Sequence, residues 1–176
     1  MNTKNLVIMA LLVGVGTVLY FVIPGYGGGM KPDFMVLMMF IGILLFPTFK
    51  EMFVLSISTG VLSGLFSTFP GGFVPNIIDK LITGIVFLVV VLLLKHLVTN
   101  LIVSTLLVGL GTILSGTIFL ISAILIANLP PESFAALFVT VVLVTGGLNA
   151  LAFFIIYPII TNILKRSKFI TAATQA

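Results

Sequence analysis

The sequence lacks cysteine altogether and carries very little charge. Its 176 residues include 8 Lys and Arg and 4 Asp and Glu, so charged residues make up 7% of the chain, whereas hydrophobic residues make up 60%. The absence of cysteine excludes disulfides, thiolate metal sites and cysteine catalysis. About a quarter of the residues in a soluble domain are charged, and a domain of this size could not bury so much apolar surface. The composition therefore predicts an integral membrane protein.

Sequence patterns that mark common catalytic sites are missing as well. No glycine-rich phosphate loop ends in Lys followed by Ser or Thr, and no HExxH zinc motif occurs. Residues 61–64 read VLSG and residues 113–116 read ILSG, so neither completes the GxSG pattern of an intramembrane serine protease. No cluster of acids resembles the metal site of a lipid head-group transferase. We therefore expect no enzymatic activity, no metal site, no cofactor and no ATP hydrolysis in this chain.

Six apolar segments, separated mostly by breaks that contain Pro or Gly, dominate the sequence. A helix that crosses the hydrocarbon perpendicularly needs about 20 residues, and the alternating pattern of a membrane barrel is absent. We expect an all-α integral membrane protein in which a single transmembrane domain, residues 1–176, forms a bundle of six transmembrane helices. The second segment is short, and either extends through Pro47 or lies inside the bundle. The expected spans are residues 6–23, 34–46, 52–69, 77–94, 97–127 and 134–164.

The basic residues indicate which ends of these spans face the cytoplasm. If the N-terminus is inside, six basic residues lie at cytoplasmic ends, and only Lys31 and Lys80 lie at outer ends. This asymmetry follows the positive-inside rule and predicts that both termini are cytoplasmic (N-in/C-in). The six residues on the cytoplasmic side are Lys4, Lys50, Lys95, Lys165, Arg166 and Lys168.

The acidic residues have the opposite distribution, because only Glu51 falls at a cytoplasmic end. No Asp, Glu, Lys or Arg lies deep in an expected span. This argues against a self-powered proton antiporter but not against a sodium-coupled carrier that uses backbone carbonyls. We expect a cluster of both signs in the outer loops, made of Lys31, Asp33, Asp79, Lys80 and Glu132.

Small residues recur four positions apart in three of the spans, a spacing that lets helices approach closely in lipid. Gly60 and Gly64 in the third span, and a stripe containing Gly116 in the fifth, are expected to pack within the bundle. In the first span, Ala10 and Gly14 either pack in the same way or dock against another membrane subunit.

Asn149, Phe153 and Tyr157 recur at helical spacing on one face of the last span. An amide in lipid requires a hydrogen-bond partner. Two interpretations are open: the amide bonds a neighbouring helix, or it forms one wall of a pocket in which it orients a solute while the rings stack on that solute.

Two stretches carry a resemblance to a known family. They read GMKPDFMVLMMFIGILLFP at residues 29–47 and TGVLSGLFSTFPGGFVPNIIDKLIT at residues 59–83. Together with six short-looped spans and small residues on the first helix, they make the chain resemble the substrate-binding S-components of energy-coupling factor (ECF) transporters. Within these it looks most like the tryptophan-transport S-component of Gram-positive bacteria. The general architecture covers the whole chain, whereas spans four to six add little motif information.

The resemblance implies a bundle in the bacterial plasma membrane that captures one solute near its outer face. It also implies partners: a transmembrane coupling protein and two cytoplasmic ATPase subunits, which use ATP while the loaded S-component reorients and releases its solute inside. In the family, small residues on the first helix contact the coupling protein, and the matching positions are Ala10 and Gly14. The usual pair is Ala with Ala, so Gly14 departs from the pattern but still leaves a flat surface.

L-Tryptophan, the implied substrate, has an ammonium and a carboxylate group that both require partners away from water. Asp33 or Asp79 is expected to bind the ammonium, and Lys31 or Lys80 the carboxylate, with Asn76 adding hydrogen bonds. Alternatively, these charges pair with one another and only hold the loops together, Asp79 with Lys80 or Asp33 with Lys31.

The indole requires an apolar slot and one acceptor for its N–H group. Phe69, Phe73, Phe153 and Tyr157 are expected to supply rings, and Asn149 an acceptor. Three other functions are compatible with the sequence: the same architecture binding a vitamin or another small solute, a standalone secondary carrier, and a structural membrane protein without a small ligand.

Overall fold

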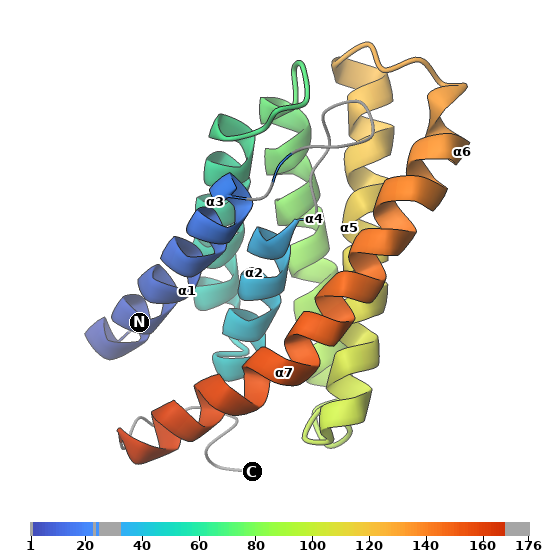
Figure 1. The fold of residues 1–176 in the computed structure, drawn as a ribbon. Helices are drawn as coiled ribbons and strands as arrows, with labels where there is room; N and C mark the ends of the chain where they lie inside the picture. The colour runs from blue at the N-terminus through green and yellow to red at the C-terminus, as the bar shows by residue number, and fades with distance from the viewer. Residues whose placement is uncertain (1, 23, 25–32, 168–176) are drawn as a thin grey trace.

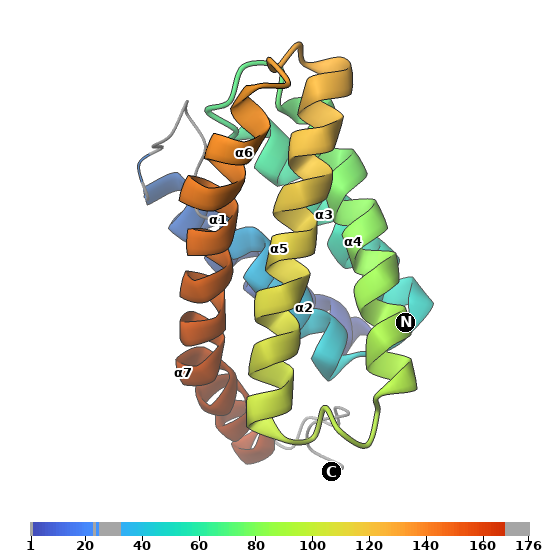
Figure 2. The ribbon, with the colours of Figure 1, turned by 90° about the vertical axis from the view of Figure 1, so that its right-hand side faces the viewer.

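The computed structural model describes residues 2–22, 24 and 33–167, and these residues form helices joined by turns (Figure 1). Six continuous helical segments pack into a bundle, which confirms the expected all-α class. In the last segment a π-helical stretch, η1, joins α6 to α7 without interrupting the helix (Figure 2). The elements are α1 (Thr3–Val22), α2 (Phe34–Leu45), α3 (Phe49–Leu65), α4 (Phe73–Leu93), α5 (Leu101–Ile126), α6 (Ser133–Leu137), η1 (Phe138–Leu143) and α7 (Val144–Arg166).

Four of the six segments are long and apolar enough to cross a membrane: α1, α4, α5 and the segment from α6 to α7. α2 has 12 residues, which extend about 18 Å at 1.5 Å per residue, whereas the hydrocarbon core is about 30 Å thick. α3 has 17 residues, with Lys50 and Glu51 in its first turn. The expected number of helical segments is therefore confirmed, but not six full-length spans, and the sidedness of the termini stays a prediction.

α2 lies at the centre of the bundle (Figure 1). Eleven of its residues are buried, and it contacts α1, α3, α4, α5 and α7. A helix that is apolar on every side is suited to such a surrounded position. Of the two alternatives for the second segment, the buried one is correct: the helix ends at Leu45 and does not extend through Pro47.

α4 begins earlier than the sequence indicated. It starts at Phe73 rather than at residue 77, and Pro75 lies in its first turn. Proline is tolerated there because the first four backbone N–H groups of a helix have no partner within the helix. The preceding turn contains Gly71 with a φ of 71°, a left-handed conformation that favours glycine. Only residues 66–72 therefore connect α3 to α4.

This earlier start corrects the prediction that Asp79 and Lys80 lie in an outer loop and that no charged residue lies deep in a helix. Both residues are in the second turn of α4, and each is 1% exposed. Glu51 is also buried, and its carboxylate accepts hydrogen bonds from the Asn5 amide at 3.4 Å and from the Thr48 hydroxyl. Each buried charge thus has polar partners inside the bundle.

The glycines of α3 allow close contact with α4, as predicted. A Cβ atom added at Gly60 would lie 3.1 Å from Cα of Ile77, and one added at Gly64 would lie 2.9 Å from the carbonyl oxygen of Phe73. Both are backbone atoms of α4, so room for an added Cβ atom would exist only if α4 itself moved. Gly116 of α5 acts similarly, because a Cβ atom there would lie 2.7 Å from a methyl group of Val142 in η1.

Replacing Gly64 with alanine is therefore expected to lower the free energy of unfolding by about 1–3 kcal/mol, the usual cost of forcing extra atoms into a packed interface. Gly147→Ala in α7 is the matched control, because a Cβ atom there meets nothing within 4 Å. The unfolding midpoints of the two purified variants in one detergent measure the difference. Equal midpoints would show that α3 and α4 do not need this close contact.

Ala10 and Gly14 lie on the outside of α1, where both are exposed. A Cβ atom added at Gly14 would meet nothing within 4 Å, whereas one added at Gly16 would lie 3.2 Å from Cγ of Met38 in α2. Gly16 therefore serves packing inside the bundle. Ala10 and Gly14 instead form a flat strip on the outer surface of α1, which we call the α1 strip.

Candidate functional site

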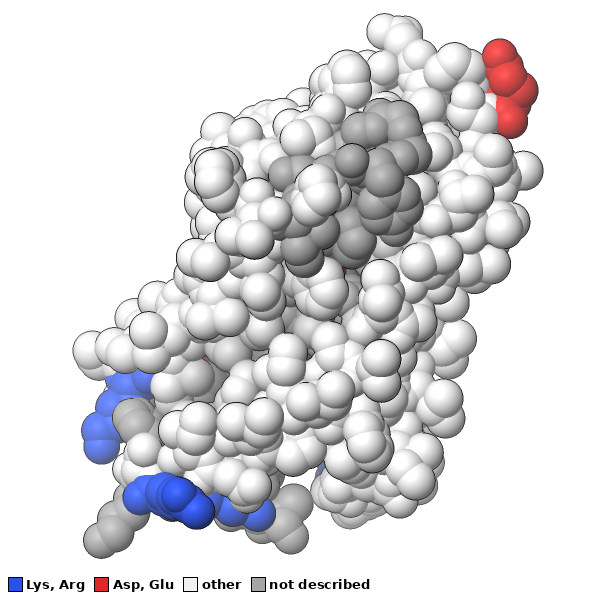
Figure 3. Space-filling model, viewed as in Figure 1, with Lys and Arg blue, Asp and Glu red and all other residues white. Residues whose placement is uncertain are grey.

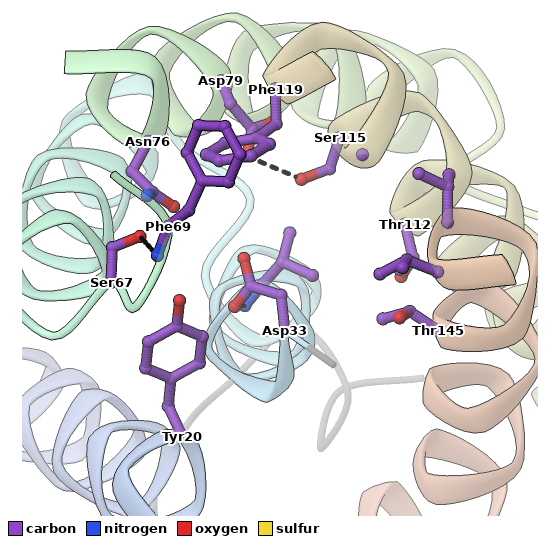
Figure 4. Close-up of a pocket in the computed structure, with 14 residues that line it drawn as sticks. Tyr20, Asp33, Ser67, Phe69, Asn76, Asp79, Thr112, Ser115, Phe119 and Thr145 are labelled. Carbon is purple, nitrogen blue, oxygen red and sulfur yellow. Dashed lines mark hydrogen bonds between the residues drawn. The ribbon is translucent and has the colours of Figure 1, made fainter. Parts of the chain in front are cut away.

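A pocket opens between α1, α2, α4, α5 and the η1–α7 segment, beside the turn that connects α3 to α4 (Figure 4). It encloses about 520 Å³ of space between atoms, including its open mouth. The lining residues are Tyr20, Asp33, Val36, Ser67, Phe69, Asn76, Asp79, Thr112, Ser115, Gly116, Phe119, Val141, Val142 and Thr145.

Lys80 forms two ion pairs beside this pocket. Its Nζ lies 2.5 Å from Oδ2 of Asp33 and also pairs with the carboxylate of Asp79. Asp79 and Lys80 are each 1% exposed, whereas Asp33 is 20% exposed. The residue before α2 and the second turn of α4 are therefore joined by one ammonium that two carboxylates share. We call these three residues the ion triad.

The hydrogen-bonding capacity of Lys80 is fully used. An ammonium has three donors, and besides the two carboxylates Nζ donates to Oγ of Ser115 at 3.4 Å. The Ser115 hydroxyl in turn donates to Oδ2 of Asp79 at 2.9 Å, and the Thr83 hydroxyl donates to Oδ1 of Asp79 at 2.9 Å. Buried charges are tolerated only when such additional bonds satisfy their remaining protons and lone pairs. This network explains why α4 can carry a lysine inside the bundle.

The charges of the ion triad do not balance. Two carboxylates and one ammonium carry formal charges of −2 and +1, which leaves −1. Asp33 and Asp79 line the pocket, whereas Lys80 does not. Because an uncompensated charge away from water is unfavourable, the pocket favours a positively charged group. Asp33 is the better placed of the two acids to meet it, because it is far more exposed than Asp79.

Asp33 also fixes the start of α2. Its Oδ1 accepts hydrogen bonds from the backbone N–H groups of Met35 at 3.1 Å and Val36 at 3.2 Å, the arrangement of a helix N-cap. Its backbone carbonyl accepts a bond from Nδ2 of Asn149 in α7 at 3.0 Å. A ligand bound to Asp33 would therefore contact the point at which α2, α4 and α7 are connected.

Two buried polar atoms have no hydrogen-bond partner within the part of the chain that the structure describes: Oγ1 of Thr145 and Oδ1 of Asn149. The two residues are 5% and 0% exposed, and they lie four positions apart, so on one face of α7. A buried polar atom without a partner costs about 1–3 kcal/mol. Since Thr145 lines the pocket, its hydroxyl is free to bond a ligand.

Three aromatic rings border the pocket: Tyr20, Phe69 and Phe119. The rings of Phe69 and Phe119 meet edge to face, with centroids 5.6 Å apart and planes at 78°, a favourable geometry for aromatic contacts. Figure 4 shows Tyr20 with its hydroxyl directed into the pocket. The Asn76 amide nitrogen donates to the carbonyl of Gly72 at 2.7 Å, which leaves the amide oxygen as an acceptor for a ligand.

Comparison with known proteins identifies the family. Residues 2–165 match the family model described as Tryptophan transporter TrpP. The chain belongs to the TrpP family. Membership confirms the resemblance that residues 29–47 and 59–83 indicated, and it agrees with a multi-pass membrane protein.

Relatives of this TrpP-family chain align with it over nearly their whole length. A protein of Bacillus subtilis (strain 168) is 49% identical over 98% of this chain and 99% of the relative. A protein of Clostridium acetobutylicum is 41% identical over 94% and 96%, and one of Clostridium perfringens (strain 13 / Type A) is 36% identical over 96% and 97%. Each is named "Probable tryptophan transport protein". No solved structure matches the chain significantly.

The TrpP-family bundle brings together several residues that the sequence singled out. Asp33, Asn76 and Asp79 line one pocket, and Lys80 lies beside it. The expected pairing of Asp79 with Lys80 is present, while Asp33 pairs with Lys80. Lys31, the alternative partner of Asp33 and a predicted ligand for the substrate carboxylate, lies outside the described residues.

The other predicted aromatic and amide residues do not line this pocket. Asn149 donates to Thr112 in α5 at 3.2 Å as well as to Asp33, so it bonds neighbouring helices. Phe153 is fully buried and stacks on Tyr157 with ring centroids 4.6 Å apart, and neither residue lines the pocket. Tyr157 instead lines a second pocket near the ends of α2 and α4. Phe73 is 42% exposed and does not line the first pocket either.

Sequence reasoning missed Tyr20, Ser115, Phe119 and Thr145. Ser115 and Phe119 lie at positions i+3 and i+7 from Thr112, so all three share one face of α5 with Gly116. The small-residue stripe of the fifth span was therefore a usable signal, although it had been assigned only to packing. Tyr20 had no such signal, because it is a single polar residue on the otherwise apolar inner face of α1. Thr145 lies four positions before Asn149 on the same face of α7, so helical spacing from Asn149 was a usable signal.

Proposed function

We propose that this chain captures L-tryptophan in the pocket beside the ion triad and delivers it to the cytoplasm as the substrate-binding subunit of an ECF-type importer. The family, and the names of relatives in Bacillus and Clostridium, support tryptophan as the solute. The observation that carries the proposal is the unbalanced formal charge of the ion triad: Asp33 and Asp79 line the pocket, whereas Lys80 does not. Such a site selects a solute with a positive group.

In the proposed binding mode the α-ammonium of tryptophan lies against Asp33, which brings the formal charge of the site from −1 to zero. The substrate carboxylate accepts a hydrogen bond from the unpartnered hydroxyl of Thr145. Lys31 stays a predicted second partner for the carboxylate. The indole lies against Phe69 and Phe119 and donates its N–H to the amide oxygen of Asn76.

A ligand panel on the purified full chain tests this assignment. L-Tryptophan is expected to raise the unfolding midpoint in detergent, because a ligand that binds only the folded state stabilises it by mass action. Vitamins and L-leucine are expected to leave the midpoint unchanged. Stabilisation by a vitamin instead of tryptophan would show that the same architecture binds another solute. An unfolding midpoint that no solute shifts at millimolar concentration would contradict a role in solute capture. Uptake into liposomes by the chain alone would favour a standalone secondary carrier.

The distribution of surface charge supports the proposed orientation. On the face in Figure 3, Lys and Arg gather at one end of the molecule, whereas the exposed acidic side chain lies at the other end. The positive-inside rule then assigns the basic end, with the start of α1 and the last turn of α7, to the cytoplasm. In this orientation the pocket beside the start of α2 and α4 is closer to the outer face.

Transport powered by ATP requires partner subunits, because the chain has no phosphate-binding loop. We assign the α1 strip, Ala10 and Gly14, to the transmembrane coupling protein that links this subunit to two cytoplasmic ATPases. The strip is exposed and has open space in front of Gly14. Small residues at this spacing allow a second helix to approach closely in lipid.

Replacing Gly14 with leucine is expected to reduce ATP-dependent uptake roughly tenfold in liposomes that also contain the coupling protein and ATPases, a loss equivalent to about 1.4 kcal/mol of docking free energy. Stabilisation of the purified variant by tryptophan should be unchanged, because Gly14 does not line the pocket. Gly147→Leu is the matched control, since it adds the same side chain at an exposed, open glycine of α7. Equal uptake by both variants would show that the α1 strip does not contact the coupling protein.

A further inference from the structure

A second pocket lies where α2 and α4 end, bounded by the turn after α4 and by the last turns of α7. It encloses about 810 Å³ of space, including its open mouth. We propose that this pocket binds an anionic phospholipid, with the lipid phosphate between Lys95, Lys165 and Tyr157. This inference does not depend on the identity of the solute in the first pocket.

Two lysines from distant parts of the sequence line the pocket. Lys95 follows α4, and Lys165 is in the last turn of α7. Neither forms an ion pair within the described residues, and both are exposed. This contrasts with Lys80, which is buried and shared by two carboxylates. The second pocket therefore has two positive charges that are free to meet an anion.

Tyr157 adds a fixed donor to these charges. Its ring is half-buried and stacks on Phe153 with centroids 4.6 Å apart, which limits its orientations. Its hydroxyl makes no hydrogen bond to any other described residue. A phosphate oxygen would accept a hydrogen bond from this hydroxyl, while the two lysines balance the negative charge of the phosphate.

The remaining lining favours a lipid over a free anion. Leu44, Val91, Leu92 and Val98 give the pocket an apolar side, and Val91 and Leu92 belong to α4, a helix long and apolar enough to cross a membrane. A free phosphate would leave this surface unused, whereas a phospholipid presents a phosphate and an acyl chain together. The pocket lies at the end where Lys and Arg gather (Figure 3), and basic pockets between transmembrane helices at such an end recognise anionic head groups.

The test measures lipid binding to the purified full chain in detergent by native mass spectrometry and by thermal unfolding. Phosphatidylglycerol is expected to be retained and to raise the unfolding midpoint, whereas phosphatidylcholine and inorganic phosphate are not. The variant Lys95→Gln/Lys165→Gln should bind phosphatidylglycerol roughly thirtyfold more weakly, since each basic residue near an anionic surface contributes roughly fivefold to the affinity and the variant removes two. Tyr157→Phe should weaken retention to a smaller extent.

The matched control is Lys50→Gln/Arg166→Gln, which removes two exposed positive charges that do not line the pocket. It should retain phosphatidylglycerol like the unmodified chain. Equal losses in the two double variants would overturn the site in favour of diffuse charge attraction, and stabilisation by inorganic phosphate alone would overturn the choice of a lipid. Both double variants should keep their stabilisation by tryptophan, so a failure of the lipid site remains distinguishable from a failure of the proposed substrate.

Discussion

Replacing Lys80 with methionine is expected to lower the free energy of unfolding by about 3–5 kcal/mol, the cost of removing one partner from a buried ion pair. Asp33 and Asp79 would then lie close together without the cation that they share. Methionine has a similar length and a flexible chain, so the change acts mainly through charge. The unfolding midpoint of the purified variant measures the effect. Lys50→Met is the control, because Lys50 is exposed, lines neither pocket and forms no ion pair with a described residue.

A second variant separates charge from packing. Lys80→Met combined with Asp79→Asn removes one of the two uncompensated carboxylates, and the new amide oxygen can still accept the hydrogen bond from Thr83. The double variant is therefore expected to be more stable than Lys80→Met alone. If it is equally unstable or less stable, loss of packing around Lys80 outweighs the repulsion between the two carboxylates.

Much of the fold follows from composition and helical length, but the boundaries of α4 do not. Pro75 suggested a loop, because proline usually interrupts a helix, yet its position in the first turn is compatible with α4. Local sequence cannot distinguish these cases, since the difference lies in whether the neighbouring α3 offers a close packing surface. Gly60 and Gly64 provide that surface. The earlier start then places Asp79 and Lys80 inside the bundle rather than in a loop.

The sequence predicted the part of the candidate site that comes from two charged stretches, around Asp33 and around Asp79 and Lys80. It did not predict contacts between single residues that are far apart in the sequence. Asp33 and Lys80 were both expected in one cluster of outer charges, although the pairings considered were Asp33 with Lys31 and Asp79 with Lys80. The bond from Asn149 to Asp33 joins residues 116 positions apart, and no local pattern indicates such a contact. Phe153 and Tyr157 show the opposite error: helical spacing from Asn149 suggested one shared pocket, but α7 is long enough to carry Tyr157 to a different one.

Replacing Asp33 with asparagine is expected to weaken tryptophan binding by about 2–5 kcal/mol, which is roughly thirtyfold or more, because the substrate ammonium loses its charged partner. Stability should change less, since asparagine is as good an N-cap as aspartate and Lys80 keeps Asp79. Titration calorimetry or ligand-dependent unfolding of the purified variant measures the loss. Glu132→Gln removes one exposed acid that does not line the pocket and should bind tryptophan normally.

Two analogues test whether the charge of Asp33, rather than its shape, accounts for this loss. Tryptamine keeps the ammonium and lacks the carboxylate, whereas indole-3-propionate keeps the carboxylate and lacks the ammonium. A pocket lined by two acids, with Lys80 excluded from its wall, should bind tryptamine more tightly than indole-3-propionate. Asp33→Asn should reduce this preference, because the variant removes one negative charge from the ion triad. If Asp33→Asn keeps the same preference for tryptamine, the substrate ammonium does not bind at Asp33. If the unmodified chain prefers indole-3-propionate, the pocket does not select a positive group, and the charge argument is wrong.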